Sequence, residues 1–352
     1  MSGQPATVDE EITHLIQETL EAGLARSRGR PARIRELQRD ATSRSSSFRT
    51  ERLRVTTDDG EQLGIYFKDL HPQHQVTQSW ALRRADRMPS NREVQMYQVV
   101  LSPERFGTLA LYGARWEPER GRCWLFIEDV GQHMLQSERD VVPWADACRW
   151  AARFHAATRD LPAAPTAFLP VYDEGRYRRC AERVQRMLER LDATEGAVVR
   201  RGLDYFTERI EWLSSLPRCV IHGQFFGKNI MLRPPPATHR IAVIDWETAA
   251  LGPGLFDLAS ISSGKWRPEQ RLAMWQAYLD EYRAATGQPI EWEEFQREFT
   301  AVAVFHALDW LVWWSQHPEP SRRFPKFLRE LEALLDRGGT VAVVEPTARE
   351  RG

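Results

Sequence analysis

The sequence lacks the features that mark a membrane, secreted or nucleic-acid-binding protein. No run of apolar residues approaches the roughly 18 that a transmembrane helix needs, and the polar, acidic segment 1–9 predicts no signal peptide. The four cysteines are far apart and form no Cys-x-x-Cys pair, which favours reduced thiols in the cytoplasm. With 48 basic and 49 acidic residues, the formal net charge of −1 gives no field that would attract nucleic acid or anionic lipid. We therefore expect a cytoplasmic protein with no nucleic-acid or membrane partner.

What the chain does have is enough length and apolar content for a substantial core. Its 352 residues are 42% hydrophobic and 28% charged, as in ordinary globular proteins. Such a length accommodates one domain of two lobes, or two domains. Composition alone therefore leaves the number of domains open.

The first part of the chain predicts a helical N-terminal extension over 1–42. Apolar residues recur at helical spacing over 10–24. Ile34 and Leu37 are expected to continue this pattern as a second helix after Pro31. A polar segment with several serines, 43–49, follows and separates the extension from what comes next.

A small antiparallel sheet with one helix is predicted over 43–130. Alternation of apolar and polar residues predicts four strands, at 52–56, 63–70, 112–116 and 124–127. The turn signal Asp58-Asp59-Gly60 joins the first two strands in a hairpin. The segment 91–100 has the apolar spacing of a helix that carries Glu93.

The chain becomes mainly helical over 131–337. Helices are predicted at 141–158, 177–191, 197–216, 255–263, 268–285, 292–314 and 324–335. Short strands are predicted among them at 220–221, 230–232 and 241–244. The last segment, 338–352, is expected to be a loosely ordered tail. A β-rich first part and a helical second part indicate two lobes of an α+β fold.

Candidate parts for phosphoryl transfer occur in this order along the chain. Such a reaction needs a lysine for the phosphates, ligands for Mg²⁺ and a group that orients the nucleophile. Lys68, at the end of a predicted strand, would contact the phosphates, and Glu93 on the next helix would hold it extended. Asn229 and Asp245 offer the oxygen ligands that suit Mg²⁺.

Further nucleotide contacts are expected on both sides of the sheet. Glu128 and Asp129 lie where a connection between lobes would present backbone groups to a base. Ser46 and Ser47 would form the loop over the phosphates, although this loop has no glycine. Lys228 either contacts the γ-phosphate or points to solvent, and the sequence leaves both alternatives open.

Several motifs together resemble one family. They are His222-Gly223 followed by Asn229, then Ile244-Asp245-Trp246-Glu247, then 252–259, with Arg92-Glu93-x-x-x-Tyr97 and 152–157. In this order and spacing they resemble the aminoglycoside phosphotransferase and choline kinase branch of the kinase-like fold. The resemblance extends from about Lys68 to Ser263, which is most of the chain.

The resemblance implies a protein-kinase-like fold, with a small antiparallel sheet in one lobe and a larger helical lobe. It also implies Mg²⁺-dependent transfer of the γ-phosphoryl group of ATP or GTP to a hydroxyl group of a small molecule. Asp245 would be the main metal ligand and Asn229 the second. His222 and Asp257 would support the catalytic loop rather than take part in the chemistry.

Gln224 departs from the family pattern, because the family has a catalytic Asp at this position. A glutamine amide cannot take a proton at neutral pH. In one interpretation Gln224 orients the acceptor hydroxyl and transfer is weakened. In a second, the chain is a nucleotide-binding pseudokinase with a regulatory or partner-binding role. In a third, another residue such as Glu247 is the base.

Overall fold

The structure is a computed structural model that describes residues 8–42, 48–71, 91–159, 161–264, 266–316 and 323–336. The predicted phosphate loop with Ser46 and Ser47, and the predicted tail, lie outside these residues. The chain divides into two compact units. The sheet unit comprises Met1–Glu138, Pro162–Phe168 and Gly227–Ala249, and the helical unit comprises Arg139–Leu161, Leu169–Phe226 and Ala250–Gly352. The segment 227–249, expected in the helical lobe, therefore groups with the sheet.

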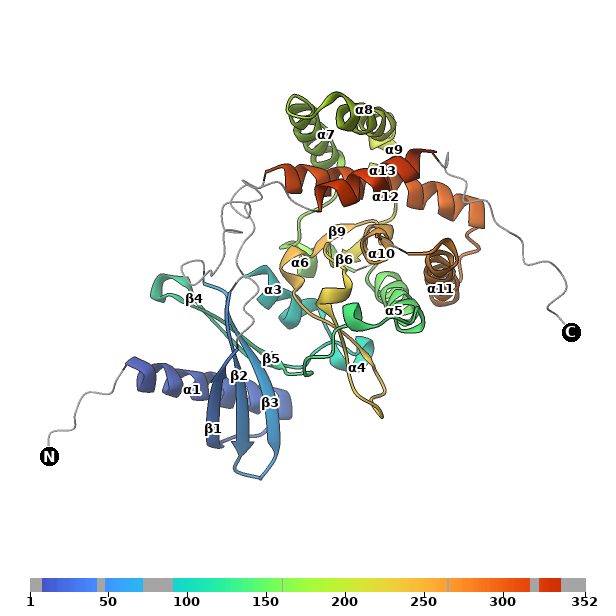
Figure 1. Cartoon of the computed structure of the whole chain (residues 1–352). Helices are drawn as coiled ribbons and strands as arrows, with labels where there is room; N and C mark the ends of the chain where they lie inside the picture. Colours follow the sequence, from blue (N-terminus) through green and yellow to red (C-terminus); the bar gives the residue numbers. More distant parts are fainter. Residues whose placement is uncertain are drawn as a thin grey trace, which may run out of the picture. The chain divides into compact units, whose positions relative to one another are not determined.

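A five-stranded antiparallel sheet forms the centre of the sheet unit (Figure 1). Its order is β1-β2-β3-β5-β4. The strands are β1 (Ile34–Ala41), β2 (Arg49–Thr57), β3 (Gln62–Asp69), β4 (Leu111–Glu117) and β5 (Arg122–Glu128). The four predicted strands are thus confirmed, and the stacked rings of Phe67 and Phe126 lie opposite each other on β3 and β5.

The prediction of a second helix after Pro31 was wrong, because Ile34–Ala41 is strand β1 at the edge of the sheet. Two apolar residues three apart share a face of a helix but would lie on opposite faces of a regular strand, so the spacing favoured the helix. In β1 the register shifts between Ile34 and Glu36, and both Ile34 and Leu37 pack against the same core cluster. Pairing decides: Leu37 lies opposite Val55 in an antiparallel ladder with β2. Strand β1 thereby supplies hydrogen-bond partners to the backbone of β2 on the side away from β3. Buried backbone groups need such partners, and this need outweighs the helical spacing of two side chains.

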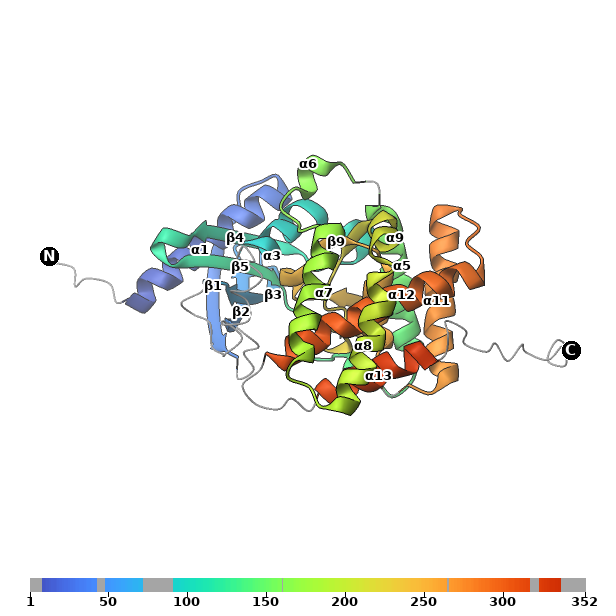
Figure 2. The same cartoon turned by 90° about the horizontal axis from the view of Figure 1, so that it is seen from above.

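Helix α1 (Val8–Arg28) covers one face of this sheet, as Figures 1 and 2 show. Its buried Ile16 and Leu20 share a core cluster with Leu53 and Phe126 of the strands. The helix approaches β4 so closely that a Cβ atom on Gly23 would lie 1.8 Å from the carbonyl oxygen of Tyr112. The predicted helix 10–24 is therefore confirmed, and it belongs to the sheet's core rather than to a separate extension.

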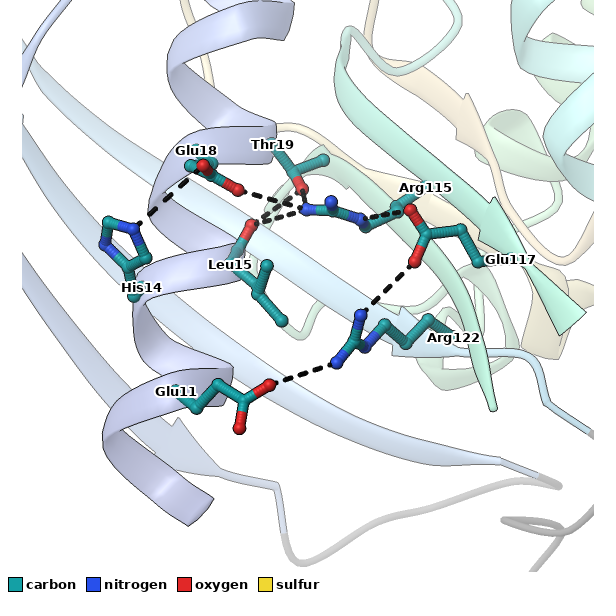
Figure 3. Close-up of polar contacts among 8 residues, drawn as sticks. All are labelled: Glu11, His14, Leu15, Glu18, Thr19, Arg115, Glu117 and Arg122. Carbon is teal, nitrogen blue, oxygen red and sulfur yellow. Dashed lines mark hydrogen bonds and ion pairs between the residues drawn. The ribbon is translucent and has the colours of Figure 1, made fainter. Parts of the chain in front are cut away.

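Polar contacts at the margin of this interface link α1 to β4 and β5 (Figure 3). Arg115 donates to the hydroxyl of Thr19 over 3.3 Å, and Glu117 bridges Arg115 at 3.0 Å and Arg122 at 3.3 Å. Arg122 also reaches Glu11 at 3.2 Å. These side chains are partly exposed, so each pair adds little, and the apolar cluster beneath them contributes most of the attachment.

Short elements complete the sheet unit. The predicted helix 91–100 is present as α3 (Arg92–Gln95) continued by a π-helical segment, η2 (Met96–Val100). The others are α4 (Pro103–Phe106), η3 (Pro118–Arg120), η4 (Leu135–Ser137), α6 (Ala163–Thr166), η5 (Gly227–Asn229), β7 (Ile230–Leu232), β8 (Ile241–Val243) and η6 (Trp246–Thr248). Strands β7 and β8 pair with each other as a separate two-stranded ribbon.

The helical unit is built around helix α12 (Trp292–Ser315), which packs against α7, α8, α10 and α13. The other elements are α5 (Val142–Thr158), α7 (Glu174–Leu188), α8 (Ala193–Thr207), α9 (Ile210–Ser215), β6 (Cys219–Ile221), β9 (Ala250–Gly252), α10 (Leu255–Ser262), α11 (Pro268–Thr286) and α13 (Phe324–Asp336). The predicted helix 197–216 is two helices. The hydroxyl of Thr207, at the break, donates to the carbonyl of Leu203, a contact that bends helices.

Strand β9 is the one strand of this unit that the sequence did not predict, and it pairs antiparallel with β6. None of the helices in the described ranges is both long and apolar enough to cross a membrane.

Candidate functional site

Lys68 and Glu93 form a buried ion pair in the sheet unit. Lys68 lies on β3 and is 6% exposed, and Glu93 lies on α3 and is 1% exposed. The ammonium nitrogen is 2.8 Å from Oε1 and 2.7 Å from Oε2 of Glu93. The same nitrogen lies 2.9 Å from Oδ1 of Asp245. Strand β3, helix α3 and the loop after β8 that carries Asp245, called the metal loop for its predicted role, therefore meet at one ammonium group. The pairing expected of Lys68 and Glu93 is present.

The charges of this cluster determine its protonation. Burial by itself lowers the pKa of Lys68, but the carboxylates of Asp245, Glu93 and Glu247 outweigh burial and hold that pKa well above its usual value. Burial raises the pKa of Glu93, Lys68 opposes the rise, and the charge of Asp245 adds to it. Lys68 therefore stays cationic and is surrounded by more negative than positive charge. Such an excess suits a site that receives a cation.

Asn229 and Asp245 lie at the same end of the β7–β8 ribbon. Ile230 pairs with Val243, and one residue beyond this pair the amide of Ile244 donates to the carbonyl of Asn229 over 2.9 Å. Asp245 follows Ile244 with a φ of 70°, a left-handed conformation that is uncommon for a residue other than glycine. The ribbon thus brings the two predicted metal ligands together although 16 positions separate them.

Helix α3 is attached to the metal loop by two further contacts that the sequence did not reveal. Arg92 donates to the carbonyl of Glu247 over 3.2 Å, and the carboxylate of Glu93 accepts from the amide of Trp246. Trp246 is fully buried, and its ring nitrogen donates to the carbonyl of Val243. The one sequence feature that could have indicated the Arg92 contact is that Arg92 directly precedes Glu93 in the motif.

The donor set of this site fits Mg²⁺. Asp245 provides a carboxylate and Asn229 an amide oxygen, which are hard ligands. The described residues contain no group of three or more His, Cys, Asp or Glu side chains that would enclose a metal ion by themselves. Mg²⁺ usually binds through one or two protein ligands and completes its shell with phosphate oxygens and water. The residues present therefore suit Mg²⁺ that arrives with a nucleotide.

Glu128 and Asp129, predicted to contact the nucleotide, have side chains that neighbouring arginines hold. Arg233 binds the Glu128 carboxylate at 2.8 Å and 3.1 Å, and Arg52 binds Asp129 at 2.9 Å. Their amide groups donate to the carbonyls of Ala110 and Gly64. Arginines therefore engage both carboxylates, and the nucleotide contact of this segment stays a prediction.

Lys228 and the catalytic-loop motif differ in their surroundings. Lys228 lies on η5 of the sheet unit and its side chain is exposed. The motif His222-Gly223-Gln224 follows β6 in the helical unit. The structure thus collects Lys68, Glu93, Asn229 and Asp245 within one unit, and His222, Gln224 and Asp257 within the other.

Asp257 holds the catalytic-loop motif through its backbone. One carboxylate oxygen accepts from the amide of His222 over 2.6 Å, and the other accepts from the amide of Gly223 over 2.9 Å. His155 lies 3.2 Å from the same carboxylate, and its other ring nitrogen lies 3.0 Å from the hydroxyl of Tyr278. All of these groups are buried, so the loop is fixed from within its own unit.

Gln224 is half-buried and its backbone is fully engaged in this loop. Its amide donates to Nδ1 of His222 over 3.2 Å, and its carbonyl accepts from the amide of Phe226 over 2.7 Å. Between them Phe225 is fully buried and stacks on Trp150. The backbone around Gln224 is thus as constrained as a catalytic residue requires, although its side chain is an amide.

The sequence profile of the phosphotransferase enzyme family (APH) matches residues 75–288. The match covers more than half of the chain, and the chain therefore belongs to this family. No curated protein matches the sequence.

Three solved structures share the fold. The GDP complex of aminoglycoside 2'-phosphotransferase-IIIa has a TM-score of 0.54 at 14% identity, and the match covers 87% of this chain and 94% of that one. The Plasmodium vivax ethanolamine kinase has a TM-score of 0.57 at 11% identity, and the match covers 86% of this chain and 84% of that one. The Streptococcus pneumoniae choline kinase has a TM-score of 0.53 at 12% identity, and the match covers 93% of this chain and 99% of that one. The predicted kinase-like α+β fold is therefore confirmed.

Proposed function

We propose that this chain transfers the γ-phosphoryl group of ATP or GTP to a hydroxyl group of a small molecule. The observation that carries the proposal is the contact of buried Lys68 and Glu93 with the partly buried Asp245, with Asn229 beside Asp245, in a member of a phosphotransferase family. The related folds include one crystallised with GDP and two kinases of amino alcohols. The four cysteines are unpaired and buried, which supports a cytoplasmic setting.

In this proposal the sheet unit binds the nucleotide and its metal. Lys68, held by Glu93, donates to the phosphates, and Asp245 with Asn229 holds Mg²⁺. Bound Mg²⁺ would neutralise the charge that develops on the phosphate oxygens. The excess of carboxylates around Lys68 supports this role, because it leaves negative charge for the metal.

Gln224 orients the acceptor hydroxyl through its amide oxygen and takes no proton. General-base catalysis contributes roughly 10²- to 10⁴-fold to a rate. Phosphoryl transfer depends mainly on position and on electrostatic stabilisation, so loss of a base slows turnover without ending it. Glu247 is a poorer candidate for the base, since its charge acts on Lys68 and its carbonyl holds Arg92.

The alternative function is a pseudokinase that binds nucleotide and transfers nothing, and the amide of Gln224 is the observation that favours it. Gln224→Asp separates the two functions. Under our proposal the natural chain consumes nucleotide in the presence of its acceptor, and the variant is about 10²-fold faster or more. Turnover that appears only in the variant would establish the pseudokinase.

The binding test compares the natural chain with Asp245→Asn. We expect ATP or GTP with Mg²⁺ to raise the melting temperature of the natural chain, and nucleotide consumption in a screen of amino alcohols, sugars and aminoglycosides to name the acceptor. Asp245→Asn is expected to lose Mg²⁺-dependent binding by about tenfold or more, since a charged ligand is removed. Asp40→Asn, on the exposed edge strand β1, is the matched control. Retained Mg²⁺-dependent affinity in Asp245→Asn would contradict the metal assignment.

A further inference from the structure

Tyr97 has a buried hydroxyl group that finds no hydrogen-bond partner among the described residues. The residue is 5% exposed, and its hydroxyl oxygen makes no hydrogen bond to any part of the chain that the structure describes. Burial of a polar group without a partner costs stability. Phenylalanine would fill the same space without that cost. We therefore expect the hydroxyl to gain a hydrogen-bond partner when the protein binds a ligand.

The position of Tyr97 connects it with the nucleotide site. It follows Glu93 by four residues on a continuous helical segment, so the two side chains share a face. It also belongs to the π-helical stretch η2, and such stretches occur frequently at functional sites. The charges of Glu93, Lys68, Asp245 and Glu128 all act on its ring. Burial raises the pKa of Tyr97 well above its usual value, so the hydroxyl remains a donor.

The hydrogen bonds of Lys68 indicate when such a donor is needed. An ammonium group has three N–H donors, and Lys68 contacts both carboxylate oxygens of Glu93 and one of Asp245. A phosphate oxygen can gain a hydrogen bond from Lys68 only if one of these contacts is given up. Lys68 contacts Glu93 twice and Asp245 once, so giving up one Glu93 contact keeps both carboxylates attached to the ammonium group. That oxygen of Glu93 then loses its donor in a buried place, which is costly unless another donor replaces it.

We propose that Tyr97 is a positioning residue of the nucleotide site, whose hydroxyl donates to the Glu93 carboxylate once Lys68 turns toward the phosphates. This inference rests on the proposed function, because it needs Lys68 to bind phosphate. It assigns the hydroxyl a partner only in the nucleotide-bound state.

The test uses Tyr97→Phe, with Tyr177→Phe as its matched control. Tyr177 is also fully buried with a hydroxyl that makes no hydrogen bond within the described ranges, but it lies in the helical unit. Without nucleotide, both variants are expected to melt at or above the temperature of the natural chain. Titration calorimetry with ATP and Mg²⁺ is expected to show affinity lowered about tenfold or more in Tyr97→Phe and unchanged in Tyr177→Phe.

The same measurements can overturn the inference. Equal affinity of Tyr97→Phe and the natural chain would reject it, as would a lower melting temperature of Tyr97→Phe without nucleotide, since the hydroxyl would then already have a partner. In a Glu93→Gln background, Tyr97→Phe is expected to change affinity by less than about twofold, because the carboxylate it serves is gone. The full penalty in that background would reject the step through Glu93. If the natural chain bound neither ATP nor GTP, the proposed function itself would fail.

Discussion

Two aspartates, the partly buried Asp245 of the sheet unit and the buried Asp257 of the helical unit, are held in different ways. In the helical unit, Asp257 accepts from the backbone amides of His222 and Gly223 and lies beside His155. In the sheet unit, Asp245 shares the ammonium group of Lys68 with Glu93. The backbone donors of Asp257 belong to the loop whose shape they define. The ammonium group of Lys68 ends a flexible side chain and can exchange its acceptors.

We infer from this difference that Asp257 has a structural role and that Asp245 is available to a ligand. Asp257 has donors on both oxygens from within the chain, so its charge is compensated in the folded protein itself. Around Asp245 the carboxylates outnumber the cation, and the pKa of Glu93 is raised by burial first and by the charge of Asp245 in addition. We therefore expect loss of charge to destabilise the fold strongly at Asp257 and little at Asp245.

The largest expected effect is that of Asp257→Asn on stability. The substitution replaces one carboxylate oxygen by an NH₂ group, which faces a backbone amide that also needs an acceptor. We expect a loss of about 3 kcal/mol in the free energy of unfolding, measured by urea denaturation. Asp245→Asn, which relieves repulsion with Glu93, is expected to change this free energy by less than about 1 kcal/mol. Equal losses in the two variants would remove the distinction between the two carboxylates.

A smaller effect is expected where helices of the two units carry a glycine. A methyl group on Gly23 of α1 would meet the backbone of Tyr112, whereas one on Gly196 of α8 would meet nothing within 4 Å among the described atoms. Gly23→Ala is expected to cost about 1–3 kcal/mol because α1 must move away from the sheet. Gly196→Ala is expected to gain roughly 0.5–1 kcal/mol from helix propensity. Thermal unfolding of both variants measures this, and a stable Gly23→Ala would contradict the close approach.

Long periodic segments made most of the fold predictable. The segments 268–285 and 292–314 carry several turns of helical spacing, and α11 and α12 match them closely. Segment 34–41 was misread because its two apolar residues have helical spacing, and no residue pattern reveals the register shift with which both pack against the core of the sheet. Strand β9 was missed because Ala250–Gly252 is too short to carry a pattern and exists by pairing with β6.

The candidate site was predictable where motifs carry it. Lys68, Glu93, Asn229 and Asp245 were found from residue type and order, and the structure brings them together. The roles of Arg92 and Tyr97 depend on tertiary contacts. Arg92 donates to the carbonyl of Glu247, and the Tyr97 hydroxyl finds no partner among the described residues. No residue pattern encodes an unpartnered hydroxyl, so this part of the site required coordinates.

A third effect concerns the pH dependence of stability and the buried His306 of the helical unit, whose polar partner is a hydroxyl group. Its Nε2 lies 3.0 Å from the Ser260 hydroxyl, and burial first, then the charge of Lys326, lowers the pKa of His306 to about 3. The unfolded chain therefore binds a proton below about pH 6.5 that the folded chain refuses until about pH 3. This contribution to stability is complete above pH 6.5 and is lost as the pH falls toward 3.

His306→Gln is expected to reduce the stability lost between pH 7 and pH 5 by about 1–2 kcal/mol, because glutamine takes up no proton in the unfolded chain. Urea denaturation at pH 7, 6 and 5 measures the slope, and the exposed His14→Gln is the control that should leave it unchanged. A reduced slope would show that the folded helical unit keeps His306 uncharged in its interior, whereas the sheet unit holds the charged group of Lys68, Glu93 and Asp245. An unchanged slope in His306→Gln would mean that the ring accepts a proton in the folded state.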